Sequence, residues 1–349
     1  MTPRQRLVAV LEGRRPDRIA TDYWATSEFD AALKAHLGCE DDESLCERLH
    51  IDQPLTIGPR PLRTGHRDDP QADQWAVRFR KIDYGTGTYN EAAHNPLAGA
   101  TSVQQVHDFA WPCPDDYDYS AVTDAIEQSD GRRAIRAGGY EPFLIYCKMR
   151  GLEQSYEDLI LYPDIAGAIL GHLFDFHYEQ NRRIYEAGQG RIDLTYVAED
   201  LGAQNGPLIS LEHYRRFLRD HQQQMADLAR SYRIHVFYHT DGAARMFLPD
   251  LIDVVGIEVL NPIQWRCPGM EREALVRDFG GRVAFHGAMD NQHTLPFGSV
   301  DDVIAEVKEN IEIFANARWI CAPCHNIQAI TPPQNIVAMY EAIHEFGKL

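Results

Sequence analysis

The chain has 349 residues, of which 44% are hydrophobic and 25% are charged, so it can bury one large core, and we expect a single domain over residues 1–349. Its net charge of −18 disfavours nucleic acid and anionic membranes as partners, because binding to phosphate requires basic patches. Seven scattered cysteines do not form a disulfide framework, and no apolar run approaches the roughly 20 residues that cross a bilayer. We therefore expect a cytoplasmic protein with reduced thiols and no membrane segment.

The first third of the chain has an irregular pattern. Apolar spacing predicts helices over 3–12, 28–37 and 43–49, and a strand over 19–24. Residues 53–114 are rich in turn formers, and the alternation in 75–80 predicts a hairpin. We interpret 53–114 as an insertion or elaboration on the main domain, because no linker-like tract brackets it.

From residue 119 onwards, strands and helices alternate. Strands are predicted over 133–137, 193–198, 234–238, 257–260, 282–286 and 318–322, and helices over 119–128, 153–161, 164–187, 211–231, 243–254, 271–279, 300–315 and 332–346. Successive strand–helix units predict a parallel sheet. With the strand at 19–24 and one more within 51–80 the count reaches eight. This count, and the lack of a glycine-rich nucleotide fingerprint after any strand, favours a (β/α)8 TIM barrel of the α/β class.

Polar side chains follow nearly every strand of this series. They are Glu199, Asp200 and Gln204 after the strand at 193–198, then His239 and Asp241, then Asn261 and Gln264, then His286 and Asp290, and finally Cys324 and His325. The carboxyl ends of barrel strands meet at one mouth, so we expect these side chains to form one site.

His239, Asp241 and Cys324 together offer imidazole, carboxylate and thiolate, which are the ligands that zinc takes in proteins. We predict that these three hold a metal, and we leave open whether Glu199 or His325 completes the shell instead of Asp241. Each histidine could also be a structural hydrogen-bonding residue, and Asp241 could cap the helix that follows it.

The remaining polar groups are assigned to acid–base work or to substrate. We predict that Glu199, Asp200 and His286 are catalytic groups that orient substrate or relay a proton. The predicted substrate-binding residues are Tyr140, Gln204, Asn261, Gln264 and Asp290.

Several segments carry a family pattern. They are 4–6 (RQR), 13–18 (GRRPDR), 199–210 (EDLGAQNGPLIS), 239–242 (HTDG), 260–264 (LNPIQ), 286–290 (HGAMD), 325–328 (HNIQ) and 332–333 (PP). Together they resemble the uroporphyrinogen decarboxylase-like superfamily. The resemblance is closer to its cobalamin-dependent methyltransferase branch, which includes O-demethylase and methylcobamide:coenzyme M methyltransferases. The resemblance implies a barrel with its active site at the mouth.

The same resemblance implies a zinc site made by a His-x-Cys motif and a later cysteine. His239 and Cys324 match the first and last of these ligands, whereas Asp241 stands where the middle cysteine belongs. A carboxylate in place of a thiolate makes the site harder and the metal a stronger Lewis acid, which favours an oxygen substrate over a thiol.

Our leading hypothesis is therefore zinc-dependent transfer of a methyl group between a small methylated oxygen compound, such as an aryl methyl ether, and a corrinoid carried by a separate protein. Uroporphyrinogen decarboxylases place arginines after the first strand, where this chain has residues 25–30 (ATSEFD), so decarboxylation of a polycarboxylate is disfavoured. Two alternatives are a metal-free decarboxylase or lyase on the same scaffold, and a noncatalytic module that binds a corrinoid or another metabolite. A homodimer is compatible with each of these readings.

Overall fold

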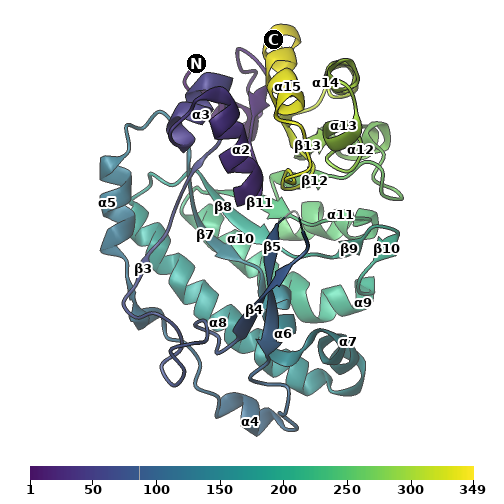
Figure 1. Ribbon diagram of the computed structural model, residues 1–349. Coiled ribbons are helices and arrows are strands. Elements are labelled where there is room, and N and C mark those ends of the chain that lie inside the picture. The colour runs from purple at the N-terminus through teal and green to yellow at the C-terminus, as the bar shows by residue number, and fades with distance from the viewer. Residues whose placement is uncertain (86) are drawn as a thin grey trace.

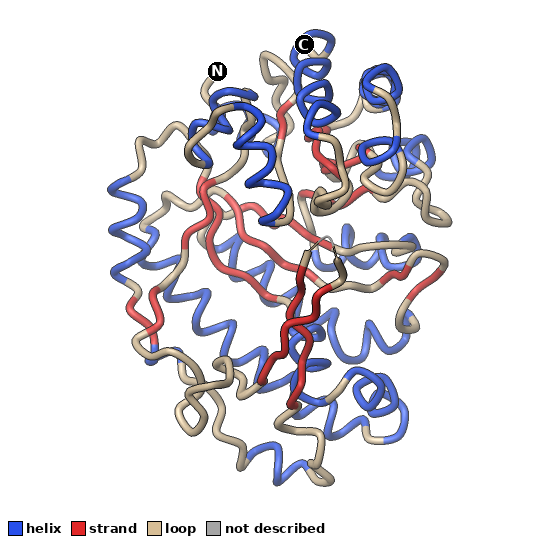
Figure 2. The backbone as a smooth tube through the Cα atoms, in the orientation of Figure 1, coloured by secondary structure: helices blue, strands red, loops and turns tan. Residues whose placement is uncertain are grey.

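The centre of the molecule is an eight-stranded sheet in which every neighbouring pair of strands is parallel. The computed structural model describes residues 1–85 and 87–349. In sheet order the strands are β2 (Leu55–Ile57), β7 (Ile135–Tyr140), β8 (Leu194–Ala198), β11 (His235–His239), β12 (Val259–Ile263), β13 (Ala284–Met289), β14 (Trp319–Pro323) and β1 (Ala20–Thr21). The strands lie inside a ring of helices (Figures 1 and 2), so the predicted α/β, barrel-like class is confirmed.

Helices cover the outside of the sheet. They are α1 (Pro3–Leu11), α2 (Ser27–Leu37), α3 (Asp42–Leu49), α4 (Val103–His107), α5 (Ser120–Gln128), α6 (Pro142–Arg150), α7 (Leu152–Leu161), α8 (Pro163–Gly188), α9 (Leu211–Tyr214), α10 (Asp220–Ser231), α11 (Leu248–Asp250), α12 (Arg272–Phe279), α13 (Thr294–Phe297), α14 (Val300–Ile313) and α15 (Pro333–Phe346). No single helix in the described part of the chain is long and apolar enough to cross a bilayer; α7 and α8 reach that length together only across a 117° bend.

Two regions differ from the predicted helices. The predicted helix over 243–254 is a series of short turns, namely a 3₁₀ turn at Arg245–Phe247, α11 and a π turn at Leu251–Val255. Helix α6 was not predicted, because its apolar residues lack a clear helical period. Pro142 begins this helix at its first turn, where a missing N–H costs nothing.

The segment at 53–114 is not wholly separate from the barrel. It supplies β2 to the central sheet, which is the strand predicted within 51–80. Beyond β2 lie β3 (Arg60–Pro61), which pairs with β6 (Tyr117–Asp118), and an antiparallel hairpin of β4 (Arg78–Asp83) and β5 (Thr88–His94). The predicted hairpin is therefore present, but it starts at Arg78 rather than at residue 75.

Side chains inside the barrel form layers. The lowest layer is apolar and packs on Leu7, Val10 and Leu11 of α1; its members are Ala20, Ala134, Leu194, Phe237, Val259, Ala284 and Ile320. Strand side chains repeat with a period of two, so residues two positions further on face the same interior. For six of the seven members those residues are Asp22, Arg136, Tyr196, His239, Asn261 and His286, which we call the mouth layer; for the seventh, Ile320, the residue is the apolar Ala322. The change from apolar side chains to side chains with polar groups at six of seven positions places the chemistry at the carboxyl ends.

The sheet has a seam between β1 and β2, which share no strand ladder among the described residues. Asp52, which precedes β2, connects the two sides of this seam through hydrogen bonds to Thr21 of β1. Its backbone N–H donates to Thr21 O at 3.1 Å, and its carboxylate lies 2.5 Å from Arg6 and 2.7 Å from Arg18. Asp52 is completely buried; Arg18 depends on it for charge compensation, whereas Arg6 is compensated by Asp52 and by Asp17.

We expect Asp52→Ala to lower the free energy of unfolding by about 3 to 5 kcal/mol, because it removes the buried carboxylate shared by Arg6 and Arg18 and leaves the partly buried Arg18 without an ion pair. Urea denaturation followed by circular dichroism measures this change. Glu43→Ala, which removes the largely exposed partner of Arg133, is the matched control and should cause a much smaller loss. Equal losses in the two variants would show that the seam does not depend on Asp52.

Candidate metal centre and active site

Three side chains at the mouth bring metal-binding atoms together. We call His239, Asp241 and His325 the metal cluster; one ligand atom from each lies within 4.8 Å of the others. Asp241 joins the two imidazoles, with Oδ1 3.7 Å from His239 Nε2 and Oδ2 3.3 Å from His325 Nε2. His239 ends β11 and His325 follows β14, so the fold joins residues that are far apart in the sequence.

Asp200 adds a fourth donor, with Oδ1 3.6 Å from His239 Nε2. Oδ1 of Asp200 and Oδ1 of Asp241 are both buried and have no hydrogen-bond donor among the described residues. Burying an unpaired carboxylate is costly unless a cation compensates it. The donor separations are close to the roughly 3.3 Å edge of a tetrahedron with bonds of about 2.0 to 2.1 Å. These residues therefore fit a cation that takes nitrogen and oxygen ligands, such as zinc.

Burial and neighbouring charges raise the pKa of two acidic groups in this region. Burial raises the pKa of Asp241, although His239 and His325 oppose the increase. Burial, and next the carboxylate of Asp200, raise the pKa of Glu141, which precedes α6. Such mutual repulsion in a buried site favours binding of a proton or a cation.

A chain of hydrogen bonds sets the orientation of His239. Its Nδ1 lies 2.6 Å from Asn261 Oδ1, Asn261 Nδ2 lies 2.6 Å from His286 Nδ1, and His286 Nε2 lies 2.9 Å from Asp22 Oδ2. An amide oxygen only accepts and an amide nitrogen only donates, so with this amide orientation Nδ1 of His239 carries a hydrogen and His286 donates from Nε2. His239 Nε2 is then left as a lone-pair donor towards Asp200 and Asp241.

Asp22 ends this chain as a carboxylate. Burial opposes its ionisation, but the hydrogen bond from His286 and the positive charge of Arg136 hold the pKa of Asp22 below its usual value. Trp24 Nε1 also donates to Asp22 Oδ2 at 2.9 Å. The carboxylate therefore fixes the ring of Trp24 as well as that of His286.

Close backbone packing holds the loop that carries Asp241. Gly242 has a φ of +69°, and a Cβ there would lie 2.5 Å from Ala203 O; a Cβ at Gly202 would lie 2.6 Å from Asp241 O. The loop after β11 thus packs against the small ladder of β9 (Gly202–Ala203) and β10 (Gly206–Pro207). Gln264 accepts a hydrogen bond from Gly242 N–H, which further fixes this loop.

A cavity of about 560 Å³ adjoins the metal cluster, and we call it the seam cavity because residues around β1 and β2 line it. Two of its walls, Trp24 and Tyr196, stack on the His239 ring with centroid separations of 5.8 and 5.9 Å. Asn326, next to His325, is another lining residue. None of His239, Asp241 and His325 is itself a lining residue, so a small ligand in this cavity would contact Trp24 and Tyr196, which pack on His239.

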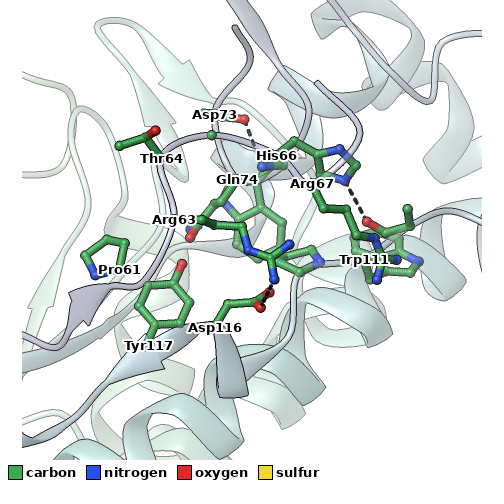
Figure 3. A pocket seen from close by; sticks show the side chains of 14 residues that line it. Pro61, Arg63, Thr64, His66, Arg67, Asp73, Gln74, Trp111, Asp116 and Tyr117 are labelled. Carbon is green, nitrogen blue, oxygen red and sulfur yellow. Dashed lines mark hydrogen bonds and ion pairs between the residues drawn. The ribbon is translucent and has the colours of Figure 1, made fainter. Parts of the chain in front are cut away.

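A second cavity, of about 550 Å³, lies in the region of β3 and β6 and shares no lining residue with the seam cavity. Figure 3 shows its wall, where Arg63 forms an ion pair with Asp116 at 2.6 Å. His66 is also held, because its Nε2 lies 2.7 Å from Ala110 O. None of the metal cluster faces this cavity.

Comparison with known proteins places this arrangement in a family. The family model described as uroporphyrinogen decarboxylase (URO-D) matches residues 81–346. The chain belongs to the URO-D family. A search of the curated proteins finds no match.

Among solved structures, a methyltransferase from Methanosarcina mazei is similar to this URO-D family chain over 99% of both chains, with a TM-score of 0.69 and 19% identity. An L-ribulose 3-epimerase is similar over 68% of this chain and 82% of its own, with a TM-score of 0.40 and 13% identity. A 3-keto-D-glucoside 4-epimerase from E. coli covers 65% of this chain and 86% of its own, again with a TM-score of 0.40 and 13% identity. At 19% identity, the similarity to the Methanosarcina mazei methyltransferase establishes that the two chains share a fold.

The structure of this URO-D family member places the predicted ligand Cys324 outside the metal cluster. Its buried Sγ donates to Ile263 O at 3.0 Å. Burial, followed by the charges of Glu306 and Asp290, raises the pKa of this thiol well above its usual value. His325, which the sequence left as an open alternative, occupies the third place in the cluster.

Glu199 and Tyr140, predicted as catalytic and substrate-binding residues, are both buried, and neither belongs to the metal cluster. Glu199 accepts hydrogen bonds from Phe143 N–H at 2.8 Å and from Leu144 N–H at 3.1 Å, so it caps the start of α6. Tyr140 packs on Phe174 and its hydroxyl has no hydrogen-bond partner among the described residues.

The other predicted substrate residues hold loops at the rim. Gln204 accepts a hydrogen bond from Gln292 Nε2 at 3.0 Å. Asp290 is buried and forms an ion pair with Arg266. Asn261 and Gln264 contact His239 and Gly242, as described above, so they position the site.

Four residues of the site were missed at the sequence level: Asp22, Arg136, Glu141 and Tyr196. Asp22 lies inside the predicted strand at 19–24, Arg136 inside that at 133–137, and Tyr196 inside that at 193–198. A polar side chain at alternate positions of an otherwise apolar strand was the available signal, since it marks the same interior face.

We expect Asn261→Ala to weaken zinc binding by about 10- to 100-fold, because it removes the partner that fixes the tautomer of His239. Competition with a chromophoric chelator measures the affinity. Asn335→Ala, which removes an equally buried amide that donates to Leu295 O and Gly298 O, is the matched control. An unchanged affinity in Asn261→Ala would contradict the assignment of His239 as a ligand oriented through this amide.

Proposed function

We propose that this protein is a zinc-dependent methyltransferase that moves a methyl group between a small methylated oxygen compound, such as an aryl methyl ether, and a corrinoid cofactor on a separate protein. The observation that carries the proposal is the metal cluster together with Asp200. Asp200 and Asp241 each have a buried carboxylate oxygen without a hydrogen-bond donor in the described structure, and a cavity walled by Trp24 and Tyr196 lies next to His239. Membership of the URO-D family, and a fold shared with a methyltransferase, support it.

The residues that would hold the metal are His239, Asp241, His325 and Asp200. Zinc bound there would act as a Lewis acid that polarises the substrate oxygen. Imidazole and carboxylate ligands make a harder site than thiolates do, and this favours an oxygen-bearing substrate. The corrinoid of the partner protein would be the other participant in methyl transfer.

The chain's own residues have three tasks in this proposal. Trp24 and Tyr196 hold the flat body of the substrate beside His239 and exclude water. Asn261 and His286 keep His239 in one tautomer and one orientation. Glu141 retains a proton to a higher pH than an ordinary glutamate, because burial and Asp200 raise its pKa, and it can donate that proton to the departing oxygen.

Decarboxylation of a tetrapyrrole polycarboxylate fits these residues poorly. Such a substrate requires several cationic groups, whereas Arg136 is the one arginine among the residues that line the seam cavity in the described structure. The segment at 25–30 leads into α2 and contains no arginine.

We expect about one zinc per chain in protein purified without a tag, measured by inductively coupled plasma mass spectrometry. His239→Ala and His325→Ala should each lose most of the metal, because each removes an imidazole of the cluster. Cys324→Ser should retain it, since the thiol donates to a backbone carbonyl instead. Loss of zinc in Cys324→Ser but not in His325→Ala would overturn the ligand set, and a wild type without metal would overturn zinc dependence.

Removal of the metal should lower methyl transfer from an aryl methyl ether to reduced cobalamin by at least about 100-fold, because polarisation of the ether oxygen is lost. The formation of methylcobalamin, followed by its absorption spectrum, measures the rate, and added zinc should restore it. Unchanged turnover after removal of the metal would contradict this mechanism.

A further inference from the structure

Arg136 is the one arginine or lysine in the mouth layer. It extends from β7 into the seam cavity, and its Nε donates to Thr56 Oγ1 at 3.1 Å. In the described part of the chain its guanidinium forms no ion pair with a carboxylate, although the chain carries 52 acidic residues and 34 basic ones. A partly buried guanidinium without a carboxylate partner favours binding of an anion.

The acidic residues around the same cavity are engaged by other groups. Asp30 and Asp42 line it, and both form ion pairs with one lysine, Lys34. Asp30 also accepts a hydrogen bond from the Tyr23 hydroxyl at 3.2 Å. Of the charged side chains that line the seam cavity, Arg136 is therefore the one that forms no ion pair in the described structure.

Trp24 connects Arg136 to the metal cluster. The guanidinium carbon of Arg136 lies 5.8 Å from the centroid of the Trp24 ring, and the ring of His239 lies 5.8 Å from the same centroid. The guanidinium and the His239 ring are thus separated by no more than the sum of these distances, which one substituted benzene ring can span.

Tyr196 lies between the two kinds of charge. Burial, followed by the acidic groups Glu141 and Asp200, raises the pKa of its hydroxyl, whereas Arg136 acts in the opposite direction. The seam cavity has an aromatic wall of Trp24 and Tyr196 and a cationic group in Arg136, and the His239 imidazole packs on the same two aromatic rings. A ligand complementary to this cavity has an aromatic ring and an anion, and the proposed function requires an ether oxygen on the side of the metal cluster.

We propose that Arg136 binds the carboxylate of the substrate, so that the substrate class is an aromatic carboxylic acid that carries its methylated oxygen on the far side of the ring. The planar guanidinium fork matches a carboxylate with two parallel hydrogen bonds, and the cavity has the volume of a small-molecule site. This inference rests on the proposed function for the identity of the reacting end, and on Arg136 alone for the anion.

The test is isothermal titration calorimetry with two probes of the same shape, para-methoxybenzoate and its uncharged amide, para-methoxybenzamide. Wild type should bind the benzoate at least about tenfold more tightly than the amide, since charge-assisted hydrogen bonds are the stronger kind. Arg136→Gln should abolish this preference while leaving the affinity for the amide unchanged. Arg136→Lys, which keeps the charge and loses the fork, should retain part of the preference, and it decides the question if Arg136→Gln does not fold.

Arg67→Gln is the matched control, because Arg67 lines the cavity of Figure 3 and lies no closer than 4.0 Å to its nearest acidic partner, Asp68. It should bind both probes as wild type does. The proposal is overturned if wild type shows no preference for the benzoate, including binding of neither probe, if both Arg136 variants retain the full preference, or if Arg67→Gln loses it instead.

The binding measurement is independent of methyl transfer. A wild type that prefers the benzoate through Arg136 but contains no zinc would reject the proposed function and leave the anion site in place. A zinc-containing wild type that transfers methyl groups without any preference for the benzoate would reject only the role of Arg136.

Discussion

The rest of the site depends on one buried chain of hydrogen bonds, which runs from His239 through Asn261 and His286 to Asp22. Its members come from three neighbouring strands and from the residue after β1, so it forms only when the sheet has curled enough to bring Asp22 to His286 although β14 lies between their strands. All four residues are buried, and each polar atom that stays unpaired there would cost free energy. The asymmetry of the Asn261 amide then determines which nitrogen of His239 faces the other ligands.

The metal cluster and the adjoining Asp200 differ from this chain, because some of their buried polar atoms have no hydrogen-bond partner in the described structure. Asp200 and Asp241 each present a buried carboxylate oxygen without a donor in the described structure. Such groups destabilise the folded chain unless a cation binds between them, and metal binding then adds directly to folding stability. The satisfied chain of hydrogen bonds and the unsatisfied carboxylates meet at His239, which makes that residue the point where the scaffold controls the chemistry.

The charges around the seam cavity differ from the acidic character of the chain as a whole. A protein with a net charge of −18 places its acids at the metal cluster, pairs the acids Asp30 and Asp42 with Lys34, and leaves Arg136 free at the other end. The aromatic rings of Trp24 and Tyr196 separate the two ends. This separation keeps Arg136 from being neutralised by the carboxylates of the cluster and leaves room for a flat ligand between them.

The sequence by itself determined the eight parallel strands and most of the helices, because period-two and helical patterns depend on local burial. It also determined that His239, Asp241 and His325 lie near one mouth, since each follows a strand. Only the tertiary structure decided which of these groups meet. Cys324 and His325 are adjacent in the chain, yet the backbone turns the thiol towards Ile263 O and the imidazole towards Asp241. The roles of Asp22 and Arg136 were likewise set by the layers of the barrel interior, because a contact between residues more than 100 positions apart leaves no periodic signal in the sequence.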